Sequence, residues 1–98
     1  MNGKRAAARE AEEVLGSRGR IRLLKALIEA QKSGRAVSMT RLKVEMGLRG
    51  RIVAEQLETL VKYGWVEEVQ TAEGRRYRLR ACGKTEAVKK LFRELEYV

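Results

Sequence analysis

The sequence contains no histidine, no aspartate and no proline, and its only cysteine is Cys82. Without histidine or aspartate, one chain cannot build a Ser-His-Asp or Cys-His catalytic triad, nor the usual zinc sites of cysteine and histidine. We therefore expect no enzymatic activity, no metal ion and no cofactor. A lone cysteine also excludes an internal disulfide bond, as is typical of proteins of the cytoplasm.

Long apolar stretches are also missing. No segment of the chain approaches the roughly 20 consecutive apolar residues that a membrane-spanning helix needs. The N-terminus lacks the apolar core of a signal peptide. Asparagine and glutamine are scarce, whereas arginine, lysine and glutamate are abundant, and this composition resembles that of thermophile and archaeal proteins. We expect a cytoplasmic protein that does not associate with a membrane.

Positive charge is present in excess. The 98 residues include 22 lysines and arginines against 13 acidic residues, which gives a formal charge of +9. Such a basic protein favours a polyanion or an acidic protein as its partner, although the same charge can simply form a well-solvated surface. The length is enough for a single domain (1–98) with one modest core.

The chain is organised around residues 38–66. Polar and apolar positions predict a short helix (38–46), a tight turn (47–50) and a longer helix (51–63). Helical spacing gathers the apolar residues of the longer helix on one face, namely Val53, Leu57, Leu60 and Val61. Two short helices joined by a tight turn bury their facing sides when they cross, which predicts a helix-turn-helix.

The ends of the shorter helix have their own signals. Ser38 is a residue type that accepts hydrogen bonds from the first backbone N–H groups of a helix, so we expect it as the N-cap. Gly47 follows the last residue of that helix, and glycine readily takes the positive φ that a helix C-terminus often needs. We therefore place the helix between these two residues.

Helical and strand periodicity also occur outside this region. We expect an N-terminal helix over Arg5–Leu15 (within a segment 1–16), a core over residues 17–83 and a C-terminal helix within 84–98. The core begins with a helix over Ser17–Lys32, whose apolar residues cover more than half of its circumference. Strands are predicted at Trp65–Thr71 and Arg75–Arg80. The fold class is mainly α with one small β-hairpin.

A subset of these residues resembles the winged helix-turn-helix domains of bacterial and archaeal transcription regulators, of the MarR, ArsR and PadR kind. The resemblance covers roughly residues 18–95, and it rests on Ser38, Leu42, Gly47, Leu48, Val53, Leu57, Leu60, Gly64, Trp65, Val66, Tyr77, Leu79 and Gly83. The sequence departs from the family at Lys43, where alanine is usual, and at Arg41, where an acidic residue is usual.

The resemblance implies binding to double-stranded DNA by a small transcriptional regulator associated with the nucleoid. Helix 51–63 would enter the major groove, and the basic hairpin of residues 70–80, called the wing below, would lie on the backbone or in the minor groove. The implied DNA contacts are Ser38, Thr40, Arg49, Gly50, Arg51, Ala54, Glu55, Lys62, Arg75, Arg76 and Arg78. The alternatives are a non-specific architectural DNA binder and a protein-contact module in a replication or transcription assembly.

Two charge patterns bear on these alternatives. The polar face of helix 51–63 carries Arg51 and Glu55, which suit guanine and cytosine respectively but which can also form an ion pair on a solvated helix. Arg75, Arg76, Arg78 and Arg80 stand in the wing without an acidic residue among them. This run predicts contact with phosphate, and the alternative is an edge strand protected from aggregation by charge.

The terminal helices predict a homodimer. Regulators of this kind often pair through flanking helices, and the apolar residues available here are Val14, Leu15, Leu23, Val88, Leu91, Phe92 and Leu95. In the alternative, the same residues close the core of a single chain.

The segment Cys82-Gly83-Lys84-Thr85 resembles the end of a nucleotide-binding P-loop. However, Arg78 occupies the position of the required first glycine, and the chain has no aspartate for the magnesium ion. We therefore expect no nucleotide, and we interpret this segment as a helix start with Thr85 as its cap.

Overall fold

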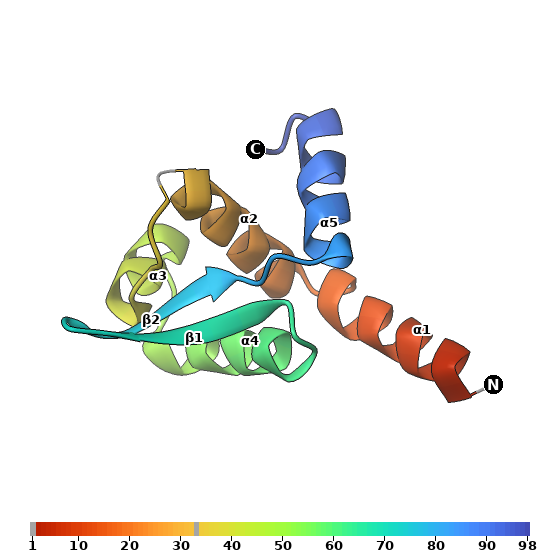
Figure 1. The fold of residues 1–98 in the computed structure, drawn as a ribbon, viewed down its shortest axis with the longest axis horizontal. Helices are drawn as coiled ribbons and strands as arrows, with labels where there is room; N and C mark the ends of the chain where they lie inside the picture. Colours follow the sequence, from red (N-terminus) through yellow and green to blue (C-terminus); the bar gives the residue numbers. More distant parts are fainter. Residues whose placement is uncertain (1, 33) are drawn as a thin grey trace.

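The computed structural model describes residues 2–32 and 34–98. The predicted domain of residues 1–98 also includes Met1 and Ser33, which lie outside the described residues. The described residues form helices and one antiparallel hairpin in the order α1 (Asn2–Leu15), α2 (Arg18–Lys32), α3 (Met39–Met46), α4 (Gly50–Lys62), β1 (Val66–Thr71), β2 (Gly74–Leu79) and α5 (Gly83–Glu94) (Figure 1). The predicted class, mainly helical with a small hairpin, is confirmed. None of the helices in the described residues is long and apolar enough to cross a membrane.

Several predicted boundaries were wrong by one to three residues, most by a single residue. The first helix begins at Asn2 rather than Arg5, and the first strand begins at Val66 rather than Trp65. The last helix begins at Gly83, with Cys82 rather than Thr85 as its N-cap. Thr85 instead lies in the first turn and is almost completely buried, where its hydroxyl donates to the Arg80 carbonyl at 2.6 Å.

The helix-turn-helix forms where its local signals predict it. The Ser38 hydroxyl accepts a hydrogen bond from the backbone N–H of Arg41 at 3.1 Å, which caps α3. Gly47 ends the helix with φ of 62°, a left-handed conformation that strongly favours glycine. The predicted caps are therefore confirmed.

A single apolar cluster joins all the helices to the hairpin. Leu23, Leu24 and Leu27 of α2 are essentially inaccessible to solvent, and so are Leu42 of α3 and Leu60 of α4. The predicted inner face of α4 is confirmed for Val53, Leu57 and Leu60, whereas Val61 is half-buried at the edge of the cluster. Burial on this scale stabilises the fold by roughly 25 cal/mol for each Å² of apolar surface removed from water.

The wing is held to the helices through its second strand. β1 and β2 pair antiparallel, with Val66 opposite Leu79 and Glu67 opposite Arg78. Tyr77 exchanges two backbone hydrogen bonds with Val37, in the segment before α3, at 2.7 and 2.8 Å. Tyr77 and Leu79 face the core as predicted. The base of the wing is therefore fixed to the start of the helix-turn-helix.

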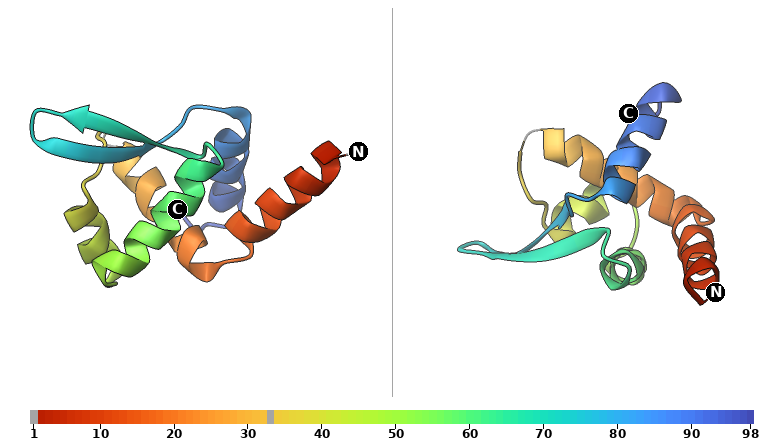
Figure 2. Two further views of the ribbon diagram at one scale, coloured as in Figure 1. Left: turned by 90° about the horizontal axis from the view of Figure 1, so that it is seen from below. Right: turned by 45° about the vertical axis from the view of Figure 1, so that its right-hand side comes forward.

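The two ends of the molecule extend in opposite directions. Figures 1 and 2 show α1 projecting away from the core on one side, while the tip of the wing projects on the other. The molecule consequently measures 43 Å along its longest axis but only 23 Å along its shortest.

Candidate nucleic-acid interface

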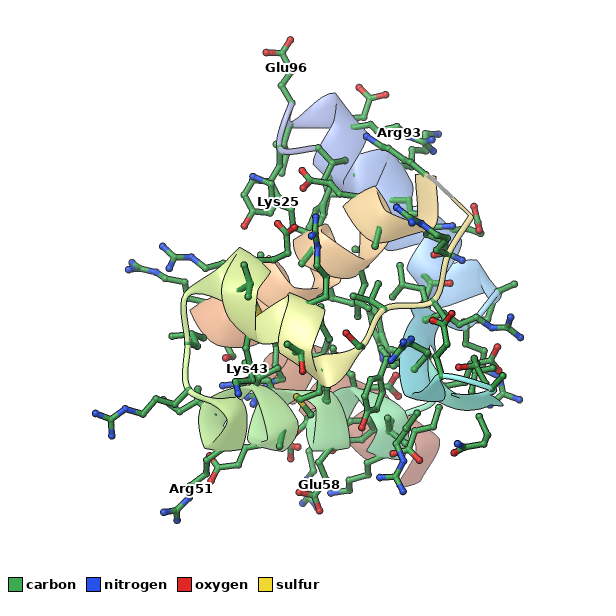
Figure 3. The ribbon with its side chains drawn as sticks, turned by 90° about the vertical axis from the view of Figure 1, so that its left-hand side faces the viewer. Lys25, Lys43, Arg51, Glu58, Arg93 and Glu96 are labelled. Carbon is green, nitrogen blue, oxygen red and sulfur yellow. The ribbon has the colours of Figure 1, made fainter. Side chains whose placement is uncertain are left out.

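The outer face of α4 is solvated and carries charge of both signs. The Arg51 side chain is 90% exposed, and its Nε lies 3.5 Å from Oε1 of Glu55, one helical turn further on. Figure 3 shows Arg51 and Glu58 extending from α4 on the side away from α3. The face can therefore contact another molecule, and its ion pair is also compatible with a solvated helix.

The start of α4 is open to an incoming ligand. Arg49 is the N-cap residue in an extended conformation, and no side chain caps the helix at this end. Arg49, Arg51 and Ala54 are all exposed, whereas Gly50 is half-buried. The predicted contacts at positions 49–55 therefore lie together around one helix end, where backbone N–H groups and the helix dipole favour negative charge.

Gly50 is half-buried because Lys43 of α3 lies against it. A Cβ atom placed on Gly50 would lie 3.3 Å from Cδ of Lys43 and 3.6 Å from its Nζ. Figure 3 shows Lys43 between α3 and α4. Gly50 therefore makes room for the stem of Lys43, which stands where the family that the sequence resembles usually has alanine. The ammonium group of Lys43 is brought to the start of α4. Sequence reasoning noted the departure at Lys43 but did not include this residue among the DNA contacts.

The predicted contacts on α3 lie at its N-terminal end. Ser38 is half-buried as the cap, and Thr40 is exposed in the first turn. Arg41 forms an ion pair with Glu45, at 2.9 Å between Nη2 and Oε1. Arg41 is the second position at which the sequence departs from the family pattern, and Glu45 of the same helix offsets its positive charge.

A groove of about 440 Å³ is lined by α2, the segment before α3, α3 and the wing. Its charged lining consists of three arginines and three glutamates: Arg35, Arg41, Arg76, Glu29, Glu45 and Glu73. Two of the arginines have carboxylate partners, whereas Arg35, before α3, forms no ion pair among the described residues. Sequence reasoning missed Arg35 because its isolated position in a turn carries no periodic signal.

The wing arginines differ from the prediction in their surroundings. The sequence predicted that the four wing arginines have no acidic neighbours. In the structure, three of the four lie beside a glutamate of the same hairpin. Arg78 pairs with Glu67 at 2.5 Å, Arg76 with Glu73 at 3.2 Å and Arg75 with Glu68 at 3.9 Å. The expectation was wrong because strand pairing brings Glu67 and Glu68 beside Arg78 and Arg75, while Glu73 in the turn lies only three residues before Arg76.

Arg80 is the exception within the wing. It is exposed at the base of the hairpin and forms no ion pair in the part of the chain that the structure describes. Its backbone N–H donates to the Trp65 carbonyl at 2.8 Å, which fixes the position of the residue. Lys62, at the end of α4, is likewise exposed and lies with its Nζ 5.2 Å from the centre of the Tyr63 ring. Arg80 belongs to the run of wing arginines predicted to contact phosphate, and its charge is less compensated than that of the other three.

The residues predicted for a dimer interface divide into two groups. Val14, Leu23, Val88 and Phe92 are at most 6% exposed within the single chain, so they already belong to its core. Leu15, Leu91 and Leu95 are 37%, 48% and 66% exposed. Only the second group offers apolar surface to another molecule, because the end of α1 leaves Leu15 partly uncovered and α5 turns one side of its apolar stripe toward solvent.

Polar contacts fix α1 to the other elements. One carboxylate oxygen of Glu10 accepts hydrogen bonds from Nε1 of Trp65 at 2.6 Å and from Nζ of Lys84 at 2.5 Å. Lys84 also donates to the Tyr63 carbonyl at 2.5 Å. The hydrogen bond from Lys84 lowers the pKa of Glu10 from its ordinary value; burial opposes this shift, and the bond from Trp65 reinforces it.

The single cysteine has a structural position. Cys82 caps α5, and its sulfur lies 3.5 Å from the hydroxyl of Thr85, which also accepts from the Cys82 backbone N–H at 3.2 Å. The contact with Thr85 lowers the pKa of the thiol, although burial acts in the opposite direction. The described residues contain no cluster of metal-binding side chains.

Solved structures of other proteins share this architecture. One is the transcriptional repressor BigR from Xylella fastidiosa, with a TM-score of 0.75 and 22% identity over 94% of this chain and 86% of that chain. Another is HlyU from Vibrio cholerae N16961, with a TM-score of 0.75 and 19% identity over 95% of this chain and 96% of that chain. No family model and no curated protein matches the sequence. The chain therefore has the winged helix-turn-helix fold, as the resemblance in its sequence predicted.

Proposed function

We propose that this protein binds double-stranded DNA and acts as a transcriptional regulator. The observation that carries the proposal is the exposed, arginine-flanked start of α4 within a winged helix-turn-helix. The similarity in fold to a transcriptional repressor and the formal charge of +9 support it.

In this proposal α4 lies in the major groove with its N-terminal end toward the bases. Arg49 and Arg51 suit the paired acceptors of guanine, and Glu55 can accept from the amino group of cytosine. Lys43 flanks this helix end, Ser38 and Thr40 stand at the start of α3, and all three residue types are suited to phosphates. The wing, with Arg75, Arg76, Arg78 and Arg80, lies along the backbone or the minor groove.

The proposal includes a homodimer. Leu15, Leu91 and Leu95 are apolar and exposed on the two terminal helices, where a second copy would cover them. Pairing through these helices would present two α4 helices to one side of the DNA, at a spacing of about 34 Å for successive major grooves. Sedimentation of the wild-type chain and of a Leu91→Glu, Leu95→Glu variant tests this part, because the charges should leave only monomer.

Selection from a random library of duplexes tests sequence reading. The wild type should enrich a short motif, whereas Arg51→Ala should lose roughly 1–3 kcal/mol on that motif and much less on random DNA. Glu55→Gln should tighten binding to random DNA and relax the choice of sequence. Arg76→Ala serves as the comparison, since it should weaken all duplexes about equally. If both arginine variants weaken every duplex alike, α4 reads no bases and the protein is an architectural binder.

One observation favours a second candidate, a protein-contact module. Carboxylates neutralise three of the four wing arginines and also Arg51, so the candidate DNA face has less net charge than its arginine content suggests. A surface of alternating charges suits a charged protein partner. The absence of DNA binding at low salt would favour this alternative.

A further inference from the structure

One side of α2 carries a row of three cations. Arg18, Arg22 and Lys25 follow one another at intervals of four and three residues, so helical spacing places them on one side of the helix, over about 10 Å. Arg18 and Arg22 are exposed, and Lys25 is half-buried. Arg20 has a different role, because its Nη1 donates to Oε1 of Gln56 on α4 at 2.8 Å. The three cations Arg18, Arg22 and Lys25 are called the basic face of α2 below.

The charge of the basic face is not compensated by neighbouring acids. None of its three cations forms an ion pair within the part of the chain that the structure describes. On α3, α4 and α5, by contrast, a glutamate of the same helix pairs with an arginine or a lysine. The only acidic residue of α2 is Glu29, four residues after Lys25, but Nζ of Lys25 lies instead 4.5 Å from the centre of the Tyr97 ring.

These charges do not stabilise the helix that carries them. The N-terminus of a helix favours negative charge, whereas α2 has no acidic residue in its first turn and begins with Arg18. Arg18 and Arg22 are also like charges one helical turn apart, and such pairs destabilise a helix. Stability of the fold therefore does not explain the basic face.

The basic face is turned away from the residues proposed to contact bases. Gly19 marks the side of α2 that faces α4, because a Cβ atom placed on it would lie 2.9 Å from Nε2 of Gln56. Lys25 follows Gly19 by six residues, which is about 120° around the helix. In Figure 3, Lys25 lies toward α5, whereas Arg51 extends from the far side of α4. One duplex along the outer face of α4 would therefore not reach Lys25.

Two features beside the basic face favour a protein over a second nucleic acid as its partner. Glu29 is exposed one turn beyond Lys25 on the same side of α2, where it would repel a chain of phosphates. Ile21 and Tyr97 are partly buried next to Lys25, and they offer apolar surface beside the charges. A row of cations that ends in an acid and has apolar groups alongside suits a protein surface of complementary charge.

We propose that the basic face of α2 binds an acidic helical segment of another protein. Carboxylates one turn apart on that segment contact Arg18, Arg22 and Lys25. An apolar side chain of the segment lies against Ile21 and Tyr97, and a cation one turn further on faces the glutamate at the end of the row. This inference does not rest on the proposed function, and the segment and a duplex would occupy different sides of the protein.

A synthetic helix provides the probe. An alanine-based peptide of about 18 residues, long enough to be helical in water, carries three glutamates one turn apart, a leucine beside them and a lysine in the next turn. Titrated at low salt into the isotope-labelled full chain, it should give saturable nuclear magnetic resonance shifts centred on the basic face and on Tyr97. The same peptide with glutamine in place of the three glutamates should bind about tenfold more weakly, as for three exposed ion pairs.

Charge reversal locates the contact. Arg22→Glu should weaken binding of the glutamate peptide by about tenfold, and a peptide with lysine at the facing position should recover most of the loss on this variant. Lys90→Glu makes the same change of charge at an exposed position of α5 and should alter the affinity by less than about twofold. Arg18→Glu should weaken binding but raise the melting temperature, since an acid then stands at the N-terminus of α2.

Three results would overturn the proposal. Equal weakening by Arg22→Glu and Lys90→Glu would indicate attraction by overall charge. Displacement of the peptide by a duplex, with shifts centred on α4 and the wing, would show that the peptide occupies the DNA surface. A lower melting temperature of Arg18→Glu would show that the fold itself uses this charge. A chain that binds the peptide but no DNA would refute only the proposed function, and the reverse result would refute only this inference.

Discussion

Nε of Arg78 lies 2.5 Å from Oε1 of Glu67, directly across the wing from one strand to the other. The arginine that sequence reasoning assigned to phosphate is therefore already paired in the DNA-free protein. Both side chains are partly solvent-exposed, so the pair contributes little to stability. Under the proposed function, its main consequence is for binding, since DNA would compete with Glu67 for the guanidinium group.

Glu67→Gln is expected to tighten binding to any duplex. The substitution removes a negative charge from the wing and releases Arg78, for a gain of up to about fivefold at low salt, on the scale of one exposed ion pair. Fluorescence anisotropy on a duplex of random sequence measures the change. Glu94→Gln, on α5, is the control with equal charge change and should alter affinity much less. Equal effects of the two variants would show that Arg78 does not contact DNA.

Leu57→Ala or Leu60→Ala should unfold or severely weaken the domain. Both side chains are almost fully buried on the inner face of α4, and such truncations cost on the order of 2–5 kcal/mol. Val44→Ala is the comparison, because Val44 is 71% exposed and should tolerate truncation. The melting temperatures of the variants, measured by circular dichroism, distinguish the buried positions from the exposed one. A Leu57→Ala protein that melts with the parent would refute the assignment of this helix face.

Lys43 and Gly50 should behave as a coupled pair. Gly50→Ala places a methyl group 3.3 Å from Cδ of Lys43, so the lysine stem, and with it the ammonium group, must shift slightly away from the start of α4. We expect this change to weaken DNA binding. In the Lys43→Ala background, Gly50→Ala should have no additional effect, since the obstructing stem is gone. A double-mutant cycle on DNA affinity and on melting measures the coupling, and strict additivity would contradict it.

Lowering the pH should release α1 from Lys84 and Trp65 before the core unfolds. Lys84 lowers the pKa of Glu10 in the folded protein, so folding favours the ionised carboxylate. The resulting stabilisation is present above the unfolded-state pKa, and it is lost as the pH falls through the lowered folded-state value. Trp65 fluorescence against pH should report the release, because its indole N–H donates to Glu10. Glu10→Gln should remove this transition, and an unchanged profile would exclude Glu10 as its source.

Local signals explain why much of the fold could be predicted. Ser38 as a cap, Gly47 as a helix end and the spacing of Val53, Leu57 and Leu60 each depend on residues within two helical turns. The resemblance in sequence then placed these elements in a winged helix. The fold could therefore be predicted from the sequence, apart from the exact ends of several helices and strands.

Features that depend on tertiary placement could not be predicted in the same way. The pairing of Glu67 with Arg78 requires the strand register, which depends on the turn between the two strands. Phe92 is buried and Leu91 is half exposed, although both belong to one apolar stripe, because only the packing of α5 determines which part is covered. Gly50 gave no sign in the sequence that it accommodates Lys43.

Salt dependence of binding to double-stranded DNA tests the central claim most directly. If the start of α4, the end of α3 and the wing contact six to eight phosphates, as we expect, log K should fall with log salt at roughly −0.9 per contact, a slope of about −5 to −7. Anisotropy titrations of one labelled duplex at several salt concentrations provide this slope. We expect tight binding at low salt that weakens steeply as the salt concentration rises. No detectable binding at low salt, or an affinity that salt does not change, would contradict it.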